Sequence, residues 1–138
     1  MEFKVKNKDL NILYTTLEKI SIKKLSANRG KVRLLSKIFN KNTEYVGDLK
    51  EIFKTYLVLE EDGRPKLTEE GHLIFINEEE IDSFNRDVNE LDNELVIVNL
   101  TEDETKINNF LNTLEDVDLD LNTQEIKLLD EVLEQIEK

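Results

Sequence analysis

The stretch SIKKLSANRGKVRLLSKI, residues 21–38, carries six Lys or Arg side chains and no acidic one. Apolar residues lie between the basic ones, and Val32, Leu35 and Ile38, with Phe39 just beyond the stretch, follow the spacing of one helix face. We therefore expect a helix that buries one face in the core and leaves a basic edge outside. The cations of this basic stripe are Lys23, Lys24, Arg29, Arg33 and Lys37.

The same helical spacing of apolar residues recurs along most of the chain. It occurs within residues 7–20, 26–39, 43–59, 77–91, 101–114 and 122–136, so we expect five or six helices. The stretch 43–59, which would begin at a Thr43 cap, has so wide an apolar face that we expect it at the centre of the core.

Two short stretches show strand patterns instead. Phe3 and Val5 alternate with charged residues, and ELVIVNL, residues 94–100, is a strand candidate that we expect to pair with them. Gly and Pro residues interrupt the helical spacing in residues 60–76, which predicts a small hairpin or a single edge strand. The predicted fold is α+β and predominantly helical, with a minor two- or three-stranded sheet.

Three of the predicted helix starts share the capping-box pattern, in which a cap residue stands three positions before a Glu. The cap side chain accepts the N–H of the third helical residue, and the carboxylate accepts the N–H of the cap residue. The pattern occurs at Asn77, Thr101 and Asn122.

Charge is divided unevenly along the chain, whose formal net charge is -12. Residues 1–37 hold 10 basic and 3 acidic side chains (+7), residues 38–59 hold three of each, and residues 60–138 hold 6 basic and 25 acidic ones (-19). We predict a single domain with a basic helical part in 1–59 and an acidic hairpin-plus-helices part in 60–138. The acidic residues provide either solubility alone or a face that imitates a nucleic-acid backbone. The candidates for that acidic face are Glu78, Glu79, Asp116, Asp118 and Asp120.

Residue types that carry catalysis are scarce. The chain has no Cys, one His (His72) and four isolated Gly, which excludes thiol chemistry, a two-histidine site and a Gly-rich phosphate loop. The series from Asp116 to Asn122 resembles the start of a calcium loop, but the Gly and Glu positions of that loop hold Leu121 and Lys127. We predict no catalytic residue, cofactor or metal ligand, and an enzyme that uses a carboxylate pair is the least favoured class.

Four stretches carry a resemblance that covers most of the chain. They are FKVKNKDL (3–10), LSANRGKVRLLSKI (25–38), EEDGRPKLTEEG (60–71) and FNRDVNELDNELVIVNL (84–100). In this order they resemble a family of small uncharacterised accessory proteins from phages of low-GC Gram-positive bacteria. The resemblance implies a soluble phage accessory protein without an assigned activity, so it provides no functional residues.

The favoured hypothesis is a non-enzymatic phage accessory protein that binds a host or phage protein in the host cytosol. Its sharper version is an acidic inhibitor that occupies a basic groove of a host or anti-phage defence factor. One alternative is a nucleic-acid-binding module that uses the stripe in residues 23–37, which the acidity of the remaining chain disfavours. Another is a virion assembly factor, which allows a homo-oligomer. The basic stripe would have no external partner if it faces the chain's own acidic part.

No stretch has the roughly 20 apolar residues of a membrane span, so we expect no membrane contact.

Overall fold

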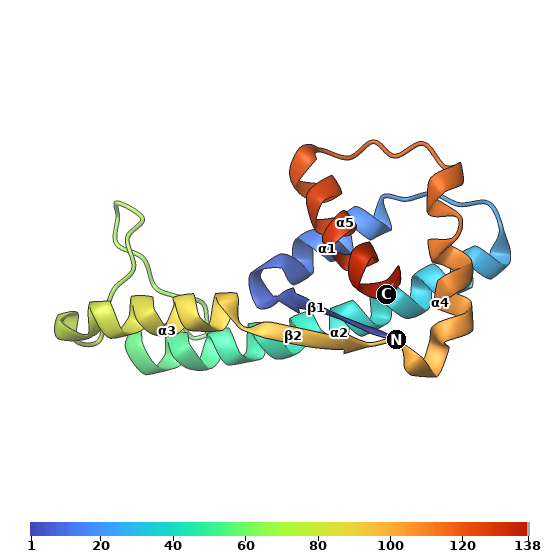
Figure 1. The fold of residues 1–138 in the computed structure, drawn as a ribbon. Coiled ribbons are helices and arrows are strands. Elements are labelled where there is room, and N and C mark those ends of the chain that lie inside the picture. The colour runs from blue at the N-terminus through green and yellow to red at the C-terminus, as the bar shows by residue number, and fades with distance from the viewer. Residues whose placement is uncertain (138) are drawn as a thin grey trace. The chain divides into compact units, whose positions relative to one another are not determined.

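A computed structural model describes residues 1–137 of the chain (Figure 1). Its strands are β1 (Glu2–Lys6) and β2 (Leu95–Asn99), and its α-helices are α1 (Leu10–Glu18), α2 (Leu25–Tyr56), α3 (Ile81–Asn93), α4 (Glu104–Leu111) and α5 (Thr123–Glu137). Short 3-10 turns lie at Asn7–Asp9, Glu78–Glu80, Thr101–Asp103 and Leu114–Asp116. Within residues 1–137 the protein is therefore a predominantly helical α+β fold with five α-helices, which confirms the predicted fold class.

The chain forms two compact units. Unit 1 consists of residues 1–42 and 95–138, and unit 2 consists of residues 43–94. Helix α2 contributes its first part to unit 1 and its second part to unit 2. These units do not coincide with the predicted parts 1–59 and 60–138, because the two ends of the chain fold together in unit 1.

The two-stranded sheet of unit 1 confirms the predicted strand pairing. Strands β1 and β2 are antiparallel, with Phe3 opposite Val98 and Val5 opposite Val96. Phe3, Val5 and Val98 are buried, while the intervening residues of β1 are exposed. The alternation in the sequence thus decides which sheet face joins the core.

Most of the buried apolar side chains belong to unit 1. Helix α2 buries a narrow face made of Ala27, Gly30, Leu34 and Ile38. At Gly30 the helix approaches α4 so closely that an added Cβ would lie 1.9 Å from the carbonyl oxygen of Lys106. The remaining buried side chains of this core are Leu10, Leu13, Leu17, Ile20, Leu100, Ile107, Phe110, Leu114, Leu128, Leu129 and Val132.

The expected break between residues 39 and 43 is wrong, because α2 continues without interruption from Leu25 to Tyr56. Thr43, expected as a cap, is a residue inside this helix. The expected burial of Val32 and Phe39 is also wrong, since these side chains are 63% and 57% exposed. The physical reason is that the face with Ala27, Gly30, Leu34 and Ile38 is the buried one, and at Gly30 the helix backbone closely approaches α4.

In unit 2, the second part of α2 lies antiparallel to α3, with a β-bridged hairpin between them (Figure 1). The aromatic rings of Phe53, Tyr56 and Phe75 surround Phe84, with centroid distances of 5.2 to 6.1 Å. Only two of this unit's large apolar side chains are buried, Leu57 and Phe84. The expectation that residues 43–59 form the centre of the core is therefore wrong.

The predicted hairpin is present in residues 57–76 as three isolated bridges, which pair Leu57 with Phe75, Leu59 with Pro65 and Leu67 with Leu73. Gly63 and Gly71 adopt φ angles of 88° and 85°, which side chains rarely tolerate. Glycine at these two positions thus permits the turns of the hairpin.

The three predicted capping boxes have different outcomes. Asn122 and Glu125 form the complete reciprocal pair at the start of α5, with distances of 2.9 and 3.2 Å. The Asn77 side chain accepts the N–H of Glu79 and begins a 3-10 turn rather than α3 itself. The prediction for Thr101 is wrong, because Thr101 lies within a 3-10 turn and donates its N–H to Asn99.

Candidate functional site

The predicted basic stripe is divided between solvent and an internal ion pair. Arg29 and Arg33 are exposed on α2, one turn apart, and neither guanidinium pairs with a carboxylate among residues 1–137. Lys23 and Lys24 are exposed just before the helix begins. In contrast, the Lys37 ammonium lies 3.5 Å from the carboxylate of Asp103, and both side chains are about four-fifths covered. Lys37 therefore matches the chain's own acidic part, as the alternative interpretation expected, while the other four cations face outward.

Beside the exposed arginines lie two apolar side chains whose exposure the helical spacing did not predict. Leu25 is 76% exposed and Val32 is 63% exposed, although both are large apolar residues. They flank a shallow hollow of about 340 Å³ on the surface of α2. We call this surface the α2 face; its residues are Leu25, Asn28, Arg29, Val32, Arg33 and Ser36.

The sequence contains a feature that could have located the α2 face. Ala27 and Gly30 are the smallest side chains of the stretch, and small residues allow a neighbouring backbone to approach. Once they are taken as the packed face, Leu25 and Val32 fall on the opposite side of the helix. The spacing of Val32, Leu35 and Ile38 instead predicted that Val32 faces the core.

Negative charge is concentrated in unit 2. Residues 43–94 contain 16 acidic and 5 basic side chains, a net charge of -11, whereas unit 1 contains 15 acidic and 14 basic ones, a net charge of -1. Glu78 and Glu79, two candidates for the acidic face, are exposed in unit 2. The other three, Asp116, Asp118 and Asp120, are exposed in the connector between α4 and α5 of unit 1.

A buried carboxylate connects α5 to α1 inside unit 1. Glu125 accepts hydrogen bonds from the Lys19 ammonium at 2.8 and 3.0 Å and from the Thr16 hydroxyl at 3.2 Å. The hydrogen bond from Lys19, followed by that from the Asn122 N–H, holds the pKa of Glu125 below its usual value of 4.5. This arrangement stabilises the fold, and all polar atoms of the carboxylate are used in it.

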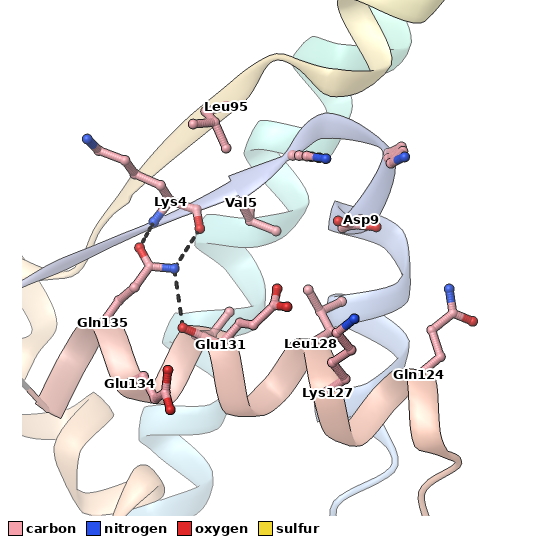
Figure 2. Close-up of a pocket in the computed structure, with 13 residues that line it drawn as sticks. Lys4, Val5, Asp9, Leu95, Gln124, Lys127, Leu128, Glu131, Glu134 and Gln135 are labelled. Carbon is pink, nitrogen blue, oxygen red and sulfur yellow. Dashed lines mark hydrogen bonds between the residues drawn. The ribbon is translucent and has the colours of Figure 1, made fainter.

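A hollow of about 680 Å³ lies in unit 1 between β1 and α5 (Figure 2). Gln135 reaches from α5 to the free edge of β1, where its carboxamide accepts the N–H of Lys4 at 2.7 Å and donates to its carbonyl at 2.9 Å. The amide thus occupies the place of a neighbouring strand. The rim mixes four lysines with Asp9, Glu131 and Glu134, so its charges offset one another and favour no ligand of one sign.

Two tyrosines of unit 2 have raised pKa values, and their hydrogen bonds are also structural. The Tyr45 hydroxyl donates to Asp92, and burial together with this hydrogen bond raises the pKa of Tyr45 to about 12. The Tyr56 hydroxyl donates to Asp87 at 2.6 Å, and this bond raises the pKa of Tyr56. Each tyrosine ties α2 to α3.

The remaining candidates for chemistry are dispersed. His72 is exposed in the hairpin, and its nearest carboxylate is Glu70 at 3.8 Å. Within residues 1–137, no three Asp, Glu, Cys or His side chains gather in a way that could hold a metal ion. None of the helices in this range combines the length and apolar character needed to cross a membrane.

The fold and the exposed α2 face define a small, predominantly helical α+β protein that presents basic and apolar groups together on one helix. The chain belongs to the family described as "Protein of unknown function (DUF1617)", whose model matches residues 1–138. No curated protein matches the chain, and no solved structure matches it either.

Proposed function

We propose that this is a phage accessory protein that acts by binding another protein, and that the α2 face is the surface it uses. The observation that carries the proposal is the exposure of Leu25 and Val32 beside Arg29 and Arg33. When a partner covers exposed apolar side chains, the complex is stabilised by about 25 cal/mol for each Å² of apolar surface removed from water. Arg is enriched in protein interfaces, and the buried core of an interface is more apolar than the rest of the surface.

The same patch argues for a protein rather than a nucleic acid as the partner. Phosphate groups would use the cations but would leave Leu25 and Val32 in contact with water. The chain's net charge of -12 adds a long-range repulsion against any polyanion. The partner is a host or phage protein in the cytosol of the infected cell.

A second function is supported by the charge of unit 2. A net charge of -11 in 52 residues suits a body that imitates a nucleic-acid backbone and competes for a basic groove on a host or defence protein. Such binding should weaken steeply as salt is added and should be blocked by competing duplex DNA. Binding to a partner whose affinity does not fall as salt is added would eliminate this second function.

Capture from host-cell extract tests the proposal. Immobilised wild-type protein is compared with a Leu25→Ser/Val32→Ser variant and with Ile126→Ser, a control that removes a 53% exposed apolar residue from α5. We expect one stoichiometric partner, lost with the double variant and retained with the control. Retention of the partner by the double variant would exclude the α2 face. A gel shift with duplex DNA at low salt serves as the opposing measurement, and we expect no retardation.

A further inference from the structure

The residues of the α2 face have a spacing with a specific geometric meaning. Residues at positions i, i+3, i+4 and i+7 of one helix enclose a hole that receives a side chain from a second helix. The α2 face contains two such holes in succession, and all its residues come from α2. The first hole is Leu25, Asn28, Arg29 and Val32, and the second is Arg29, Val32, Arg33 and Ser36.

The side chains around these holes suit an aliphatic knob. Asn28 and Ser36 are short, while Leu25 and Val32 provide apolar walls that are 76% and 63% exposed. The two apolar residues are seven positions apart, which is about 10.5 Å along a helix axis. A strand presents a side chain to one face about every 6.6–6.8 Å, so its spacing does not match. A partner helix repeats at the same two-turn interval and does match.

The positive charge of the α2 face indicates which residues should flank the apolar stripe of this partner helix. Arg29 and Arg33 stand together beside the apolar pair, and residues 19–43 contain no acidic side chain. Among residues 1–137 no carboxylate pairs with either guanidinium. The planar guanidinium donates two parallel hydrogen bonds to a carboxylate. A partner helix with Asp or Glu beside its apolar stripe would provide that carboxylate.

From these observations we infer that the α2 face binds an amphipathic helix of a partner protein whose apolar stripe is flanked by acidic residues. This inference rests on the proposed function and names the chemistry of the partner. The apolar pair supplies most of the affinity, and the arginines select the charge and direction of the incoming helix.

The inference is tested with the full-length protein and a fluorescent 21-residue model peptide. The peptide carries Leu at heptad spacing with Glu on the adjoining positions. Two matched peptides replace either every Glu by Lys or every interfacial Leu by Ser. By fluorescence anisotropy we expect the Leu/Glu peptide to bind and each matched peptide to bind at least tenfold more weakly. Circular dichroism should show that the bound peptide gains helix.

Charge reversal on the protein gives the sharper result. An Arg29→Glu/Arg33→Glu variant should lose at least tenfold in affinity for the Leu/Glu peptide and should prefer the Leu/Lys peptide. The control variant Lys8→Glu/Lys127→Glu makes the same change in net charge at two exposed positions outside the α2 face and should keep the wild-type preference. Equal loss in both variants would overturn the inference, because it would mean that net charge alone governs binding.

The outcomes separate this inference from the proposed function. If host-protein capture depends on Leu25 and Val32 but no peptide preference exists, the acidic-helix partner is wrong and the proposed function stands. If light scattering shows a dimer that Val32→Ser dissolves, the occupant is a second copy of the chain and the inference is overturned. Binding of duplex DNA that Arg29→Glu abolishes would overturn both.

Discussion

Gly30 is the position at which a single methyl group should reveal how unit 1 is packed. In an exposed helix interior, replacing Gly by Ala is favourable by about 1 kcal/mol, because Gly loses more backbone entropy on folding. At Gly30 the new Cβ would meet the Lys106 carbonyl oxygen at 1.9 Å, which is 1.5 Å short of the 3.4 Å at which ordinary contact begins. Its other neighbours would be the Lys106 carbonyl carbon at 2.7 Å and the Phe110 Cβ at 3.1 Å.

The overlap should outweigh the propensity gain. Because the obstacle is backbone rather than a flexible side chain, α2 and α4 must separate, which loosens the packing of Phe110. Overpacking of this kind costs about 3 kcal/mol at the upper end of its usual range. After the gain of about 1 kcal/mol from helix propensity is subtracted, Gly30→Ala should lower the free energy of unfolding by about 2 kcal/mol. Gly47, on the same helix, has nothing within 4 Å of an added Cβ. Gly47→Ala should therefore gain about 0.5–1 kcal/mol.

Urea unfolding followed by far-UV circular dichroism measures both variants against the wild type. Native-state hydrogen exchange of the α2 amides then assigns each change to its part of the helix. We expect opposite signs for these two identical chemical changes. A Gly30→Ala protein as stable as the wild type, or more stable, would refute the close approach of α2 to α4.

Three further predictions concern the contacts inside each unit. Phe84→Ala should destabilise unit 2 by about 3 kcal/mol because it empties the centre of the aromatic cluster, and faster hydrogen exchange confined to residues 43–94 would show this. The pKa of Glu125 is lowered in the fold, so its stabilising effect is present above about pH 4.5 and is lost as the pH falls through the folded-state pKa. Urea midpoints measured from pH 7 to pH 3 should thus decline less in Glu125→Gln than in the wild type, with Glu134→Gln as the control that behaves like the wild type. Ultraviolet titration should find that Tyr45 ionises with a pKa of about 12, and Asp92→Asn should lower this pKa. The stabilisation that comes from the raised pKa of Tyr45 is complete below pH 10 and is lost as the pH rises from 10 to about 12.

Local patterns in the sequence predicted the local structure well. Alternation at Phe3 and Val5 located the sheet face that is buried, and the three-residue interval from Asn122 to Glu125 located the start of α5. Both features depend on residues close to each other in the chain or on a strict two-residue period. Such patterns retain their meaning whatever the remaining chain does.

Burial depended on packing that periodicity does not encode. Residues 43–59 carry a wide apolar face, but only α3 and the hairpin of unit 2 are available to cover it, so it is half-buried. On the first part of α2, the face with Ala27, Gly30, Leu34 and Ile38 is buried, because the absence of a side chain at Gly30 lets the helix backbone approach α4 closely. Val32 consequently points outward, which turned a predicted core position into the candidate binding surface.

The binding role of the α2 face is tested most directly by site-specific photocrosslinking in cells that produce the protein. Val32 is replaced by the photoreactive residue p-benzoylphenylalanine, and in a second strain Ile126 on α5 is replaced in the same way, because the two positions are 63% and 53% exposed. We expect a discrete protein adduct from position 32 that disappears when Arg29→Glu/Arg33→Glu is added, and no such adduct from position 126. Equal adducts from both positions, or none from position 32, would contradict it.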